Sequence, residues 1–195
     1  MTTDQKLVAA KLRRWKKYLL EYELPTWENI PDIGLYMEQV IILLKQYLDY
    51  LPPELKEAQF ITASTINNYV RMKVIPEPVK KRYYRVHIAY LIMVLSMKTG
   101  IEISLIQKLI PSDMTEDEVQ SFYREYFDLH KKTCEFFTKS IASVSGPLLG
   151  HELSGDLDIE NPGNLVAFSA IMSGFSHLFS EKLLLLEDKP YEGES

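Results

Sequence analysis

The chain has 195 residues, of which 46% are hydrophobic and 25% charged, and its formal net charge is −5. This length suits one domain or two small ones, and the composition is ordinary for a globular protein. No apolar run is long enough to span a membrane, and the basic, amphipathic N-terminus lacks the features of a signal peptide. A single cysteine, Cys134, excludes an internal disulfide. We therefore expect a cytoplasmic protein with no membrane partner.

The N-terminal part, residues 1–49, is predicted to form helices that pack on the core. Residues 3–22 have the apolar spacing of a helix, which Pro25 stops. Residues 34–50 form a second amphipathic helix, and the proline pair at 52–53 ends it because proline cannot continue a helix.

Basic charge is concentrated in residues 61–99, which carry seven Lys and Arg residues and only Glu77 as an acid, a net charge of +6. Residues 100–195 carry a net charge of −10. A concentrated basic segment in an acidic chain favours a local site for a negatively charged partner. The alternative is a solvated run of charges.

Three helices are predicted in and after this segment, over residues 65–72, 84–98 and 103–110. Thr62 or Ser64 suits the N-cap of the first helix. The apolar face of that helix consists of Ile66, Tyr69 and Val70. Between the first two helices, Pro76 and Pro78 force a turn, and a β-hairpin is expected at residues 74–84.

The last part, residues 111–195, is expected to be helical and to serve dimerisation or effector binding. Thr115 and Glu118 form the capping-box pattern of a helix start. An apolar stripe then runs for about seven turns and is either core or a subunit interface. Residues 146–163 read as a loop, and residues 164–186 as a final, largely apolar helix.

Aromatic side chains gather on the long helix and would suit a pocket for a small-molecule effector, with core packing as the alternative. They are Phe122, Tyr123, Tyr126, Phe127, Phe136 and Phe137.

Signals for catalysis are weak. The four histidines lack metal-ligand spacing, and no second cysteine is present to complete a zinc site. Residues 155–161, GDLDIEN, resemble only part of a calcium loop, since the central glycine and the distal glutamate are missing. We predict no catalytic residue, no metal and no cofactor, and therefore no enzyme.

The basic segment combines a short polar helix, a proline-bounded turn and a Lys/Arg/Tyr strip, an arrangement that DNA-binding proteins use. Asn67 and Asn68 are candidates for contacts with base edges, because an amide can donate to and accept from adenine at once. Local capping or an exposed polar face is the alternative for both asparagines. Further candidates are Arg71 and Lys73 beside them, Lys80, Lys81, Arg82 and Arg85 for the DNA backbone, and Tyr83 for packing the strip and bonding phosphate.

The same residues resemble the DNA-binding domain of MerR-type regulators. MKVIPEP is similar to the turn of that domain, KKRYYR to its wing, HIAYLIMVLSMK to the next helix and ISLIQKLI to the last. The resemblance is closer still to a bacterial family, domain of unknown function 1836, over roughly residues 24–110. It implies a mostly helical fold with a winged helix-turn-helix module at residues 50–110 and a small β-hairpin wing. Two departures from the MerR pattern are Lys73, where a glycine is usual, and the asparagines, where an arginine and a tyrosine are usual.

We therefore expect a sequence-specific DNA-binding protein, a transcriptional regulator that binds double-stranded DNA as a homodimer. An unidentified small-molecule effector is a further candidate partner. The alternative is a protein–protein interaction module on a helix-turn-helix scaffold that does not bind DNA. The acidic C-terminal third favours this alternative because it would repel a duplex unless it faced away.

Overall fold

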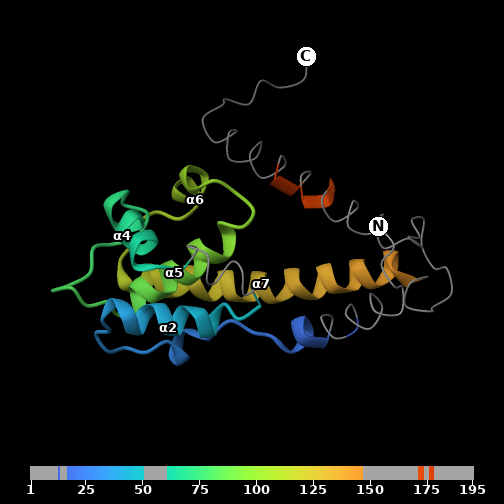
Figure 1. Ribbon diagram of the computed structural model, residues 1–195, viewed down its shortest axis with the longest axis horizontal. Helices are drawn as coiled ribbons and strands as arrows, with labels where there is room; N and C mark the ends of the chain where they lie inside the picture. The colour runs from blue at the N-terminus through green and yellow to red at the C-terminus, as the bar shows by residue number, and fades with distance from the viewer. Residues whose placement is uncertain (1–12, 14–16, 51–60, 147–170, 174–175, 178–195) are drawn as a thin grey trace, which may run out of the picture.

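The computed structural model describes residues 13, 17–50, 61–146, 171–173 and 176–177. Three predicted elements lie largely outside the described residues. They are the helix at residues 3–22, of which residues 13 and 17–22 are described, the loop at residues 146–163, of which only the first residue is described, and most of the helix at residues 164–186. The fold is mostly helical, as predicted (Figure 1). Its elements are η1 (Trp27–Asn29), α2 (Met37–Tyr47), α4 (Ala63–Arg71), α5 (Arg85–Met97), α6 (Ile103–Leu109) and α7 (Glu116–Val144).

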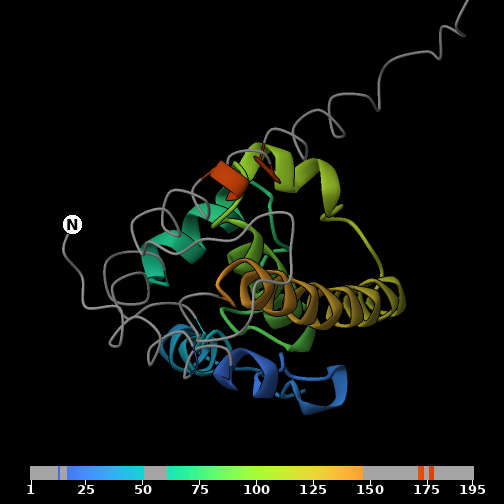
Figure 2. The same ribbon diagram turned by 90° about the vertical axis from the view of Figure 1, so that its right-hand side faces the viewer.

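Helix α5 is the centre of the fold. Every residue from His87 to Ser96 is buried, because α5 is apolar around its whole circumference and must be covered on all sides. Helices α2, α6 and α7 all contact it. In both whole-molecule views α4 and α6 lie on one side and α2 on the other, with α5 and α7 between them (Figures 1 and 2).

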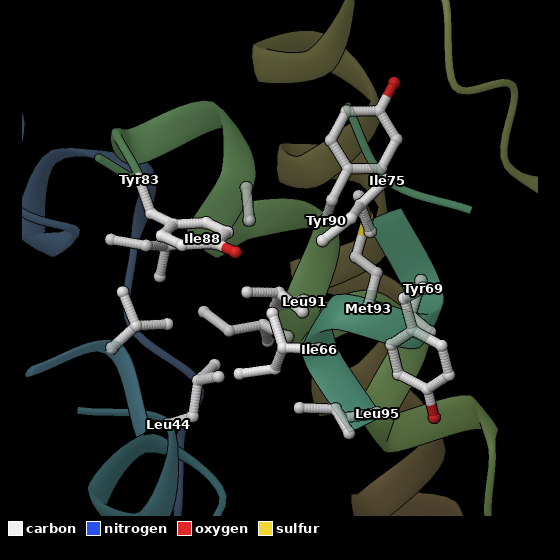
Figure 3. Close-up of a cluster of buried hydrophobic side chains, with 14 of the residues drawn as sticks. Leu44, Ile66, Tyr69, Ile75, Tyr83, Ile88, Tyr90, Leu91, Met93 and Leu95 are labelled. Carbon is white, nitrogen blue, oxygen red and sulfur yellow. The ribbon is translucent and has the colours of Figure 1, made fainter. Parts of the chain in front are cut away.

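The core is one continuous cluster that runs in sequence from Leu24 to Tyr123. Leu44 of α2, Ile66 of α4 and Leu91 of α5 meet within it (Figure 3), and each is fully buried. The N-terminal helix α2 and the basic segment therefore share a single core.

Helix α7 begins with the predicted capping box. The Thr115 N–H donates to Glu118 Oε2 at 2.7 Å, and the Glu118 N–H donates to Thr115 Oγ1 at 3.4 Å. These contacts satisfy two donors that a helix start leaves unpaired.

The first turns of α7 are joined to the segment around η1. The buried Tyr123 hydroxyl donates to the Pro25 carbonyl at 2.7 Å, and the Arg124 guanidinium lies 2.6 Å from Glu28 Oε1. Further along α7, Tyr22, Tyr50 and Tyr126 surround the imidazole of His130. Burial lowers the pKa of His130 below its usual value.

The expected β-hairpin takes the form of isolated bridges in the described part of the chain. Val79 pairs with Arg82 and Leu35 pairs with Tyr83, both antiparallel. Pro76 and Pro78 have no backbone N–H, so the pairing cannot extend towards α4, and Tyr84 already serves as the N-cap of α5. The described residues thus contain a single tight turn where the prediction placed a wing.

Candidate nucleic-acid interface

Helix α4 presents a polar face to solvent. Its N-cap is Thr62, whose Oγ1 accepts the Thr65 N–H at 3.1 Å, which settles the choice between Thr62 and Ser64. Ile66 and Tyr69 are buried, whereas Ser64, Asn67 and Arg71 are exposed. Residues 64, 67 and 71 are spaced by three and four, so they lie on one side of the helix. Apolar burial on the opposite side fixes this orientation.

The side-chain amide of Asn68 contacts two residues at the end of α4. The Arg71 Nη2 donates to its Oδ1 at 2.6 Å, and its Nδ2 lies 3.3 Å from the Met72 sulfur. The amide therefore positions Arg71, and Asn67 is the more exposed of the two asparagines.

Helix α4 is closed by a Schellman motif, with Met72 as the C-cap and Lys73 as the residue after it. The Val74 N–H donates to the Tyr69 carbonyl at 2.9 Å and the Lys73 N–H donates to the Val70 carbonyl at 3.0 Å. Lys73 has a φ of 56°, a left-handed conformation in which glycine is preferred. An exposed lysine therefore stands at a position where glycine would carry less strain.

Lys80 and Lys81 form the tip of the tight turn. Val79 and Arg82 exchange two backbone hydrogen bonds, of 3.1 and 3.0 Å. The two lysines between them have φ values of 50° and 63°, as a type I′ turn requires. Asn-Gly is the usual pair in this turn, because each left-handed non-glycine residue costs about 1–2 kcal/mol. Both lysines are exposed, so two positive charges are held at a strained tip.

Two of the predicted residues, Arg82 and Arg85, form hydrogen bonds within the protein, although Arg82 remains exposed. Arg82 donates to the Gly34 carbonyl at 3.2 Å and to the Tyr36 hydroxyl at 2.8 Å. Arg85 donates to the Ile30 carbonyl at 2.9 Å.

Tyr83 is 2% exposed and belongs to the core. Its side chain therefore packs beneath the turn, in agreement with the prediction that Tyr83 packs the basic strip onto the protein. Its burial removes it from the candidate contact surface, which corrects the prediction that it bonds phosphate.

An open groove of about 570 Å³ lies beside the polar face of α4. One wall is α4 and the other is the corner between α5 and α6. Its lining residues are Ser64, Thr65, Asn67, Asn68, Tyr69, Arg71, Lys98 and Ile103. Lys98 is a basic lining residue that the sequence analysis did not select as a contact, since it stands apart from the other basic residues at the end of an apolar helix.

The aromatic residues of α7 divide into two groups. Tyr123 is fully buried, and Phe122, Tyr126 and Phe127 pack against the core. Phe136 and Phe137 are exposed. A small cavity of about 240 Å³ remains between Trp27, Tyr123 and Phe127.

The described helices contain none that is both long enough and apolar enough to cross a membrane. Fold and surface together define a mostly helical protein that carries exposed basic residues at the end of α4 and on the turn that follows it. The model of a family described as a domain of unknown function (DUF1836) matches residues 25–127. This match covers more than half of the chain, and the protein belongs to that family. Comparisons with curated proteins and with solved structures find no match.

Proposed function

We propose that the protein binds double-stranded DNA in a sequence-dependent way and regulates transcription. The polar face of α4 lies towards the bases, and the Lys80–Lys81 turn contacts the phosphate backbone. Both elements lie at the same end of the molecule in Figure 1, while α7 extends away from it.

The observation that carries the proposal is the turn. Backbone strain persists where the surrounding structure enforces it, and it clusters at functional sites. Here two adjacent lysines occupy positions where Asn-Gly would relieve the strain. Positive charges at an exposed tip are suited to contacts with DNA phosphates. Such contacts fix the register of a DNA-binding protein on the duplex.

A homodimer is part of the proposal. Leu129 and Phe136 of α7 are 61% and 73% exposed, and their separation of seven residues places them on one side of the helix. Pairing of two copies through this side would present two α4 helices to paired half-sites. Sedimentation equilibrium of wild type and Phe136→Ser tests it, because only the wild type should associate.

The DNA-binding proposal is tested by fluorescence anisotropy with labelled genomic duplexes, at salt concentrations from about 50 to about 200 mM. Lys80→Ala/Lys81→Ala should reduce the slope of log affinity against log salt by roughly 2, because each phosphate contact contributes about 0.9. The matched control is Lys17→Ala/Lys108→Ala, which removes two exposed lysines from other elements and should leave the slope unchanged.

Asn67→Ala should change the preferred sequence without changing the salt dependence, since base contacts specify and phosphate contacts position. A uniform loss of affinity on all duplexes would contradict base reading by Asn67. Absence of duplex binding by the wild type at low salt would overturn the DNA-binding proposal. It would favour the second candidate, a protein-interaction module that binds a partner through Leu129 and Phe136.

A further inference from the structure

The groove beside α4 is built from two elements that are distant in sequence. Residues 64–71 of α4 form one wall, and Lys98 and Ile103 at the corner between α5 and α6 form the other. Gln107 of α6 donates to the Met72 carbonyl at 2.7 Å and so ties α6 to the end of α4. The two walls are therefore held in a fixed relation.

The charged groups of the groove are both positive. Among its described lining residues the ionised side chains are Arg71 and Lys98, one from each wall, and no acid is present. Lys98 does have an acidic neighbour, Glu102, 3.4 Å from its ammonium, but Glu102 is mostly exposed and lies outside the lining. An exposed pair of this kind contributes about 0–1 kcal/mol, so an incoming anion can replace it.

The remaining lining suits a sugar–phosphate chain. Ser64 brings a hydroxyl group, and Ile103 brings an apolar surface. The volume, about 570 Å³, is well within the range of about 300–1,000 Å³ that accommodates small organic ligands.

We propose that this groove holds the backbone of one DNA strand, with a phosphodiester between Arg71 and Lys98. This inference rests on the proposed function and adds Lys98 to the contacting residues. The Lys80–Lys81 turn and the groove then contact separate phosphates, and together they fix how Asn67 approaches the bases.

The test compares single-lysine variants in the anisotropy titration. Lys98→Ala should reduce the slope of log affinity against log salt by about 0.9, the value for one lost phosphate contact. Lys108→Ala removes an exposed lysine of α6 that does not line the groove, and its slope should equal that of the wild type. Glu102→Gln should increase the affinity, because it releases Lys98 and removes a negative charge beside the strand.

Two results would overturn the inference. The first is a wild-type slope for Lys98→Ala while Lys80→Ala/Lys81→Ala still lowers it, an outcome that leaves DNA binding intact. The second concerns the source of the phosphate: if thymidine monophosphate or inorganic phosphate binds with dependence on Lys98 while duplex binding does not depend on it, the groove serves small phosphate esters. Failure of the wild type to bind any duplex would instead remove the proposed function itself. Thermal unfolding of each variant checks that the fold is unchanged.

Discussion

The Lys80–Lys81 turn allows stability and DNA binding to be separated in one experiment. Both residues have positive φ, and relief of a left-handed non-glycine residue is worth about 1–2 kcal/mol. Asn tolerates this conformation and Gly adopts it freely, although Gly adds entropy to the unfolded chain. We expect Lys80→Asn/Lys81→Gly to raise the free energy of unfolding by about 1–2 kcal/mol in total. For a chain of this size the midpoint of thermal unfolding rises by roughly 2–8 °C.

The matched variant is Lys80→Gln/Lys81→Gln, which removes the same two charges but keeps two residues strained. Both variants should lower the salt slope of DNA binding by the same amount, roughly 2. Only the Asn-Gly variant should gain stability in calorimetry or urea unfolding. Equal stability of the two variants would refute the inference of strain. Unchanged DNA binding in both would refute the role of the turn.

Three further predictions concern contacts that assemble the fold. A β-carbon on Gly34 would lie 2.8 Å from Arg82 Cδ, so Gly34→Ala should destabilise by about 1 kcal/mol; urea unfolding should show a smaller cost in an Arg82→Ala background, and equal costs would contradict the clash. Tyr123→Phe removes the buried hydrogen bond to Pro25 and should lower the free energy of unfolding by about 1–2 kcal/mol. A urea-unfolding midpoint equal to that of the wild type would contradict this expectation. Burial lowers the pKa of His130, so on acidification the imidazole is protonated in the unfolded chain before it is protonated in the folded protein. The stability that neutral His130 contributes is complete above about pH 6.5 and should fall as the pH drops towards the folded pKa. His130→Phe should flatten this dependence, and identical pH profiles for the two proteins would rule it out.

Local patterns in the sequence predict the helices well. The caps at Thr62 and Thr115 are readable because each side chain has its partner three residues away in the chain. Apolar spacing likewise predicts that Ile66 and Tyr69 of α4 face inward, since a helix must bury its apolar side.

The direction of the basic side chains could not be predicted in the same way. Lys81 and Arg82 are adjacent, yet Lys81 is exposed at the tip while Arg82 bonds to Gly34, 48 residues away in sequence. Arg85 bonds to Ile30 across 55 residues. Such long-range partners leave no local signal.

The conformation of the turn and the groove beside α4 could not be predicted from the sequence, for related reasons. Lys80 and Lys81 are not typical residues of a type I′ turn, so the sequence favours an unspecified hairpin and not this conformation. Lys98 joins the candidate surface only because the corner between α5 and α6 lies opposite α4. Tertiary packing, and not periodicity, brings these residues into one surface.

The hydrogen bond between Tyr123 and Pro25 joins residues 98 positions apart, close to the two ends of the family region at residues 25–127. The chain thus enters and leaves this region at one place. Regions of this kind tolerate circular permutation and insertion into other proteins, because a short linker can join their ends. The same closeness implies that folding must close a loop of nearly the whole region before this contact forms, and such non-local contacts slow folding. The folding rate of the family region should therefore depend on when α7 docks on the segment around η1.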